Sequence, residues 1–288
     1  MSREKYRDNF ITYRPNQRHE LGYLQTWIVM TKNIIRSRDL IWQLFKRDYF
    51  ATYKKSFIGI AWVIISPILG IISWVFLRSA GMLNPGDVGI PYPAYVLIGT
   101  SMWGLFMGFF TSATQMLETG NRIVIQVNFP HEALLFQQGA IQLSNFFFSL
   151  LVNIIVLIIF GVTPRWGIIF LPLVTLPLFF LGSAIGLIAS MISVVAVDIN
   201  RLLTTVMGLL LFTTPVIYSD KIGNVWVQQL INWNPLTYLV CSARDIVLFG
   251  RLYHPTGYFI CAIVSFLIFL IAGRLFYVSE NKIIEKMI

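Results

Sequence analysis

The sequence predicts an all-α integral membrane protein with six transmembrane helices, an N-terminal amphipathic interfacial helix, and re-entrant external helices between the fifth and sixth spans. Of the 288 residues, 56% are hydrophobic and 12% are charged, whereas a soluble domain carries roughly 25% charged residues. Seven stretches of 18 residues or more also contain no Asp, Glu, Lys or Arg. About 20 apolar residues are enough to cross a bilayer, so lipid is the expected surroundings of this chain.

The N-terminal part of the chain divides into a polar tail, residues 1–22, and a segment of alternating apolar and basic residues, 23–55. The apolar residues recur at three- and four-residue steps, which indicates an amphipathic helix at the membrane surface. This helix either anchors the chain on lipid or offers a surface to a cytoplasmic partner. Residues 1–55 hold 12 of the 22 Lys and Arg residues, which favours a surface facing anionic headgroups. Nucleic acid is the weaker alternative, because no recognised binding motif accompanies the basic residues.

The six spans belong to a transmembrane domain of residues 56–278. We predict them at residues 57–78, 92–117, 137–161, 168–196, 201–218 and 256–277. The charge-free stretch 222–243 is not counted as a span, because polar side chains such as Asn224, Gln228 and Asn234 are costly against lipid. We expect residues 222–247 to be re-entrant and shielded by protein.

The distribution of basic residues predicts the orientation. Six spans place both termini on the same side of the membrane, and that side receives 17 of the 22 Lys and Arg residues, against 5 on the other. The side richer in Lys and Arg is normally cytoplasmic. Both termini, including the short tail 279–288, are therefore expected in the cytoplasm.

A short cytoplasmic loop, residues 118–134, connects the second and third spans. Its apolar residues are unusual for a loop in water, and they include Ile123, Val127 and Phe129. Pro130 suits the first turn of a new helix. We expect this loop to lie on the membrane or to dock into another protein.

Motifs for phosphate binding or hydrolytic catalysis are missing from the sequence. It contains no G-x-x-x-x-G-K-[ST], H-E-x-x-H or G-x-S-x-G. The three histidines are far apart in the sequence, and the two cysteines have no paired spacing. We therefore expect no catalytic residue, no metal site and no cofactor in this chain. The aromatic residues Tyr95, Trp103 and Phe106 of the second span either face lipid or offer rings that stack on sugars.

Several segments occur in an order and spacing typical of one family. Residues 46–62 read Lys-Arg-Asp-Tyr-Phe-Ala-Thr-Tyr-Lys-Lys-Ser-Phe-Ile-Gly-Ile-Ala-Trp, and the loop ends in Phe-Pro-His-Glu at residues 129–132. Thr214-Pro-Val-Ile-Tyr218 then precedes Asn234-Pro-Leu236 and Arg244-Asp245. Over residues 35–278 the chain resembles ABC-2 type permeases of the bacterial polysaccharide-export branch, which move O-antigen, capsule or teichoic acid.

The resemblance implies a channel-forming half-transporter of the bacterial inner (plasma) membrane. Two copies would form a homodimer, and two separate ATP-binding cassette subunits would bind ATP and Mg and carry out hydrolysis, so this chain would not itself be an enzyme. The substrate would be a polyprenyl-pyrophosphate-linked polysaccharide, O-antigen foremost. Two alternatives stay open: an ABC-2 exporter of another cargo, and an intramembrane enzyme that acts on lipid-linked sugars through Asp87, Asp220 or Asp245.

The resemblance also assigns candidate sites. The residues expected to couple to the ATPase are Asn121, Arg122, Ile123, Phe129, Pro130, His131 and Glu132. Basic side chains that match pyrophosphate oxygens are expected where the lipid-linked substrate enters, at Arg47, Lys54 and Lys55. The aromatic residues of the glycan channel would be Trp62, Tyr95, Trp103 and Phe106. The external gate would comprise Pro215, Tyr218, Asn234, Pro235, Arg244 and Asp245.

Overall fold

The computed structural model describes residues 22–54, 59–117, 131–194, 196–221 and 223–287, and every regular element in these ranges is a helix. The all-α prediction is confirmed for this part of the chain. Four helical segments are long and apolar enough to cross a membrane: Tyr92–Thr114, Glu132–Ile159, Trp166–Ser193 and Pro255–Ser279. A shorter apolar helical segment covers Ile65–Ser79.

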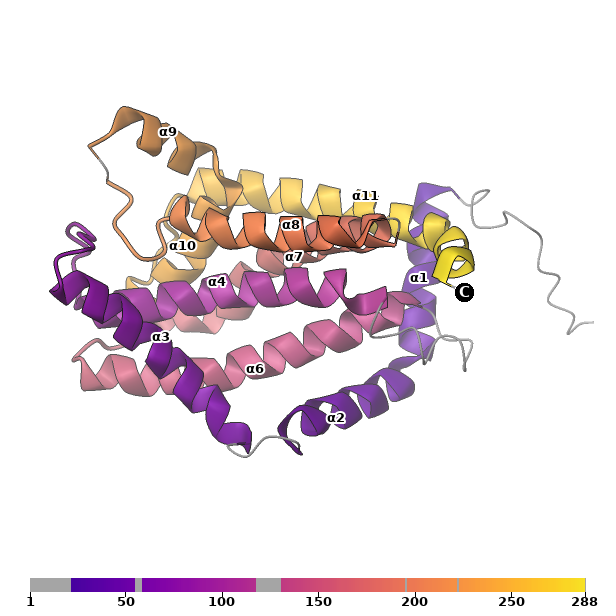
Figure 1. The fold of residues 1–288 in the computed structure, drawn as a ribbon, viewed down its shortest axis with the longest axis horizontal. Coiled ribbons are helices and arrows are strands. Elements are labelled where there is room, and N and C mark those ends of the chain that lie inside the picture. Colours follow the sequence, from indigo (N-terminus) through magenta and orange to yellow (C-terminus); the bar gives the residue numbers. More distant parts are fainter. Residues whose placement is uncertain (1–21, 55–58, 118–130, 195, 222, 288) are drawn as a thin grey trace, which may run out of the picture.

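The predicted interfacial helix is two helices, α1 (Tyr23–Arg36) and α2 (Arg38–Lys54), which are separated at Ser37. Helix α1 lies across one end of the bundle, near the C-terminal end of α11 (Pro255–Met287) and the beginning of α6 (His131–Ile159) (Figure 1). The indole of Trp27 lies against α11, because a Cβ at Gly273 would come within 2.7 Å of that ring. Gly273 therefore provides the space in which α1 docks.

Helix α4 (Tyr92–Thr114) is at the centre of the bundle and packs against α6, α7 (Leu171–Ser193) and α3 (Trp62–Ser79). Its most extensive contact is with α7, where two glycines let the helices approach closely. A Cβ at Gly186 would lie 2.5 Å from the carbonyl oxygen of Phe110, and one at Gly182 would lie 3.0 Å from that of Phe106. The G-x-x-x-G spacing in α7 thus permits close packing of two membrane helices.

The helix of the predicted fifth span is shorter than expected. Helix α8 (Val197–Leu209) continues as a 3-10 turn, η3 (Leu210–Phe212), and the helix ends there rather than at residue 218. Pro215 has no backbone N–H and cannot extend a helix. Two further 3-10 turns precede apolar helices, η1 (Gly59–Ala61) before α3 and η2 (Trp166–Phe170) before α7.

Helices α9 (Val225–Trp233) and α10 (Pro235–Leu248) connect α8 to α11 at the end of the bundle opposite α1 (Figure 1). Asparagine caps both helices: Asn224 accepts hydrogen bonds from two backbone N–H groups of α9, and Asn234 accepts one from Leu236. Trp233 of α9 is 87% exposed, whereas α10 is buried along its length between α4, α7 and α11.

Candidate functional site

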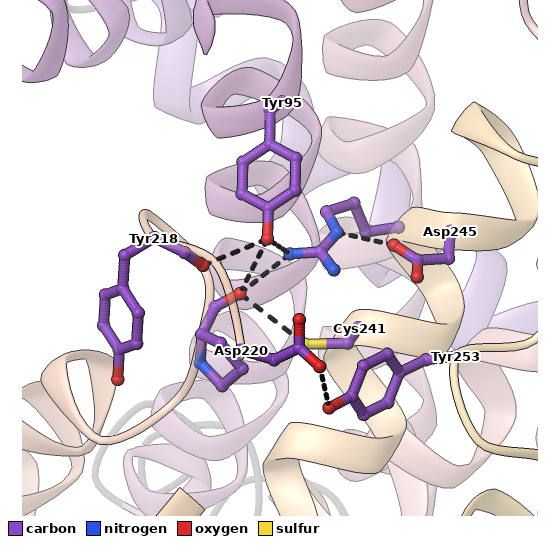
Figure 2. Close-up of polar contacts among 8 residues, drawn as sticks. Tyr95, Tyr218, Asp220, Cys241, Asp245 and Tyr253 are labelled. Atoms are coloured by element: carbon purple, nitrogen blue, oxygen red, sulfur yellow. Dashed lines mark hydrogen bonds and ion pairs between the residues drawn. The ribbon is translucent and has the colours of Figure 1, made fainter. Parts of the chain in front are cut away.

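Arg244 of α10 lies at the centre of a buried polar cluster, of which Tyr95 and Asp245 are labelled in Figure 2. The side chain is 3% exposed; its Nε donates to Asp245 Oδ1 at 2.7 Å and its Nη1 to the carbonyl oxygen of Pro215 at 2.7 Å. Nη1 also contacts the hydroxyl of Tyr95, and the guanidinium lies 4.1 Å from the centre of the Tyr95 ring. A buried guanidinium is tolerated only when it is paired and hydrogen-bonded, and these three partners meet that requirement.

The cluster holds residues 213–220, which we call the pinned segment, against α4 and α10. The hydroxyl of Tyr95 donates to the carbonyl oxygen of Tyr218 at 3.0 Å, and that of Tyr92 donates to the carbonyl of Ile217 at 3.0 Å. From the other side, the Asn234 amide donates to Thr214 Oγ1 at 2.8 Å. Non-helical backbone inside a membrane protein must find such partners, because lipid supplies none.

A glycine allows the pinned segment to approach α4. A Cβ at Gly99 would lie 2.6 Å from the carbonyl oxygen of Val216, a distance that side chains do not tolerate. Gly99 lies one helical turn after Tyr95, on the same side of α4. The pinned segment is therefore fixed both by hydrogen bonds and by the fit of its backbone against the helix.

A polar cleft of about 750 Å³ lies beside the cluster. Its charged lining residues are Asp87, Asp220, Asp245, Lys221, Arg244 and Arg251. Tyr253 also lines it and donates to Asp220 Oδ2 at 2.8 Å. Burial and this hydrogen bond raise the pKa of Tyr253 above its usual value, so the phenol remains a protonated donor. The cleft therefore offers both acidic and basic side chains to a polar ligand.

Five of the six predicted gate residues meet in the Arg244 cluster and the pinned segment, and Tyr95, a predicted channel aromatic, joins them. Pro235, the sixth predicted gate residue, instead occupies the first position of α10, where proline favours the start of a helix. No pattern in the sequence pointed to Lys221, Arg251 or Tyr253. Tyr92 could have been found, because it precedes Tyr95 by three residues and shares its helix face.

The predicted coupling residues Asn121, Arg122, Ile123, Phe129 and Pro130 lie outside the described residues, and of His131 only its place at the start of α6 is described. Glu132 is described and is 3% exposed. Its Oε1 accepts a hydrogen bond of 2.8 Å from the Asn33 amide of α1. Glu132 therefore ties α1 to the first turn of α6, where a carboxylate also suits the helix dipole.

Among the basic residues predicted where substrate enters, Lys55 and the side chain of Lys54 lie outside the described residues. Arg47 is on α2, about half exposed, and its Nε lies 2.6 Å from Asp48 Oδ1. Asp48 also accepts a hydrogen bond of 3.1 Å from Gln137 of α6. The Arg47 guanidinium thus stands at the surface beside a carboxylate that joins α2 to α6.

The four predicted channel aromatics are not brought together on one surface. Trp62, at the start of α3, is 45% exposed, whereas Tyr95, Trp103 and Phe106 are buried within the chain. The rings of Trp103 and Phe106 pack 5.5 Å apart. They could touch a sugar only after the helices around α4 separate, so their role in a channel remains a prediction.

The chain is similar in sequence to known membrane proteins. The sequence profile described as ABC-2 type transporter matches residues 39–248. An O-antigen export system permease protein RfbA of Myxococcus xanthus is 24% identical over 263 residues, which cover 90% of this chain and 100% of the relative. Two RfbA proteins of Klebsiella pneumoniae, each 24% identical, cover 78% and 88% of this chain and 86% and 94% of their own lengths. The profile match begins in α2 and ends at the last residue of α10, so it includes the Arg244 cluster, and the chain belongs to the ABC-2 type transporter family.

Proposed function

We propose that this chain is the channel-forming permease subunit of an ATP-driven exporter that moves a polyprenyl-pyrophosphate-linked polysaccharide, O-antigen foremost, from the cytoplasm across the bacterial inner membrane. The observation that carries the proposal is the match to three relatives named O-antigen export permeases, which extends over nearly their whole length. Capsule and teichoic acid are related cargoes that the same architecture would serve.

The proposed topology has six spans, formed by α3, α4, α6, α7, α8 and α11, with both termini in the cytoplasm. Figure 1 supports it, because α4, α6, α8 and α11 run lengthwise between the end that carries α1 and the end that carries α9, and α3 lies obliquely beside α4 and α6. The excess of Lys and Arg on the terminal side gives the orientation. Helices α9 and α10 then form the external re-entrant pair, and the pinned segment completes the short fifth span.

A homodimer of this chain is proposed to work with two ATP-binding cassette subunits, which bind ATP and Mg. The docking surface would combine α1 with loop 118–134. Leu24, Ile28 and Ile35 of α1 support this assignment, because all three are exposed and their spacing places them on one helix face. Helix α1 lies at the bundle end where α6 begins (Figure 1).

An intramembrane enzyme acting on lipid-linked sugars is the second candidate, and one observation favours it. The external carboxylates Asp87, Asp220 and Asp245 line the same cleft. Two of them already have structural partners, since Asp245 pairs with Arg244 and Asp220 accepts from Tyr253. Replacing each of the three with Asn tests this candidate: loss of sugar-modifying activity with intact export would favour the enzyme.

The test of the proposed exporter is purification from native membranes followed by reconstitution. The expected result is a stoichiometric ATPase subunit that copurifies, and ATP-dependent transfer of the strain's lipid-linked polysaccharide across the vesicle membrane. A chain that is isolated without an ATPase subunit would refute the exporter. A complex that hydrolyses ATP but does not move the polysaccharide would indicate another cargo.

A further inference from the structure

A second cleft, of about 300 Å³, enters the bundle between α3, α4 and α6, away from the Arg244 cluster. Its polar lining residues are Ser66, Thr100, Ser101, Gln142, Asn145 and Ser149, and it contains no charged residue among those that line it. Ser101 lies in the middle of α4, and Gln142 to Ser149 occupy the middle of α6. In the proposed topology this cleft is therefore at the depth of the bilayer core.

Polar groups at this depth require partners, because hydrocarbon offers no hydrogen bonds. Some bonds are made within the wall: Gln142 Nε2 donates to Ser112 Oγ at 2.8 Å, and Asn153 Nδ2 donates to Ser101 Oγ at 2.7 Å. Since Ser101 accepts from Asn153, its own proton can be donated into the cleft. Asn153 itself does not line the cleft; it is fully buried, and its Oδ1 has no hydrogen-bond partner among the described residues. The wall is thus positioned by internal hydrogen bonds, and the Ser101 hydroxyl can still donate a hydrogen bond into the cleft.

Two glycines keep the cleft open. Gly70 of α3 and Gly104 of α4 line it, and a Cβ built on either would meet nothing within 4 Å. This differs from Gly182 and Gly186, where the missing Cβ lets two helices touch. Small residues usually bring membrane helices together, but here they leave a space.

The chemistry of the cleft selects among occupants. A lipid acyl chain is thin enough, but it would leave the hydroxyl and amide groups unpaired. A helix from a second copy is about 10–12 Å wide, too wide for a cleft of about 300 Å³. A thin, uncharged, hydroxyl-rich chain satisfies both conditions, and Phe146 in the wall offers a ring for the apolar face of a sugar.

We propose that the cleft between α3, α4 and α6 binds successive sugar residues of the exported polysaccharide through Ser101, Gln142 and Ser149. The proposal rests on the proposed function and concerns a different surface from the predicted aromatics. At about 100° per residue, Thr100, Ser101 and Gly104 lie on the face of α4 roughly opposite Tyr95 and Phe106. The glycan would therefore follow the polar face of α4 while the aromatic face stays packed.

Thiol protection tests the contact directly. The variant Ser149→Cys would be reconstituted with the ATPase subunit, with Cys261→Ala in the background and the fully buried Cys241 retained. A small neutral thiol reagent should label the new cysteine, and polysaccharide-loaded lipid from the producing strain should slow labelling about tenfold, as expected for a site that the ligand occupies. The matched control is Leu151→Cys, on an exposed side of α6, whose labelling should not change.

Filling the cleft tests its use in transport. Gly104→Phe should reduce export about tenfold or more, the change expected when a binding contact is lost. The control Leu151→Phe, on an exposed side of α6, should export normally, and both variants should bind the ATPase subunit as the wild type does.

Three outcomes would overturn the proposal. Normal export by Gly104→Phe, with no protection of the Ser149→Cys thiol in vesicles where the wild type exports, would remove the site and leave the exporter intact. Equal protection by sugar-free polyprenyl phosphate would assign the cleft to a lipid chain. Failure of the wild type itself to export would overturn the proposed function, and this site with it.

Discussion

Replacing Arg244 with Met should be the most damaging single change at the end of the bundle opposite α1. Met keeps much of the side-chain volume but removes the charge, and it leaves the Asp245 carboxylate, 7% exposed, without its cation. Breaking a buried ion pair costs about 3–5 kcal/mol. The carbonyl oxygen of Pro215 also loses a donor at 2.7 Å, which costs about 1–3 kcal/mol. The combined loss is about 4–8 kcal/mol.

The double variant Arg244→Met/Asp245→Asn separates these two contributions. Because no unpaired charge remains, the double variant should lose only the second contribution, about 1–3 kcal/mol. Thermal unfolding in detergent should therefore place its melting temperature well above that of the single variant, since about 1 kcal/mol corresponds to roughly 2–4 °C for a chain of this size. Arg244→Lys should lie between the wild type and the single variant, because an ammonium cannot contact three groups as the guanidinium does.

Equal melting temperatures of the single and double variants would refute this prediction. That result would mean that the Asp245 carboxylate is not held by Arg244 in the folded protein. A single variant as stable as the wild type would further mean that the pinned segment does not depend on this cluster.

Three other substitutions test separate contacts. Gly99→Ala should displace the pinned segment and raise ion leakage through reconstituted vesicles, because its Cβ would lie 2.6 Å from a backbone carbonyl; the control Gly104→Ala meets nothing within 4 Å, and equal leakage from both would contradict the proposed contact. Glu132→Ala should cost about 1–3 kcal/mol by leaving the Asn33 amide unpaired and should speed proteolysis within α1, so unchanged digestion would show that α1 is held by other contacts. Phe129→Ala should uncouple ATP hydrolysis from export without changing the melting temperature, since buried aromatic anchors dominate interfaces; normal coupling would exclude Phe129 as the anchor.

The sequence was informative about the structure where polar side chains made a segment unsuitable for contact with lipid. Asn224 and Asn234 excluded residues 222–243 as a span, and the structure uses both side chains as helix caps. Hydropathy predicted the wrong end for the helix of the fifth span, because it measures how well a segment suits lipid and not whether the helix continues. Residues 213–218 are apolar enough to extend a span, but they leave the helix before Pro215 and bond to Tyr92, Tyr95 and Arg244 instead.

The faces of α4 could not be assigned from the sequence for a related reason. In a membrane, both the protein-facing and the lipid-facing sides of a helix are apolar, so periodicity does not separate them. Tyr95 and Arg244, which are 149 positions apart, meet only because α10 returns into the bundle. The polar face through Thr100 and Ser101 was not recognised from the sequence, because aromatic residues precede and follow these two positions along the chain.

The burial of α10 has a consequence for the order in which the chain is assembled. A helix that carries Arg244 and Asp245 side by side is a poor substrate for direct insertion into lipid, because each charge is costly there. Its partners Tyr95 and Pro215 come from segments made earlier, whereas α11, which covers it on another side, is made later. In the proposed topology, helix α10 should therefore enter the bundle last, from the external side and after α11 has crossed the membrane. Until then it would stay within reach of periplasmic proteases, so a defect in the cluster would reduce the amount of protein in the cell before it altered transport.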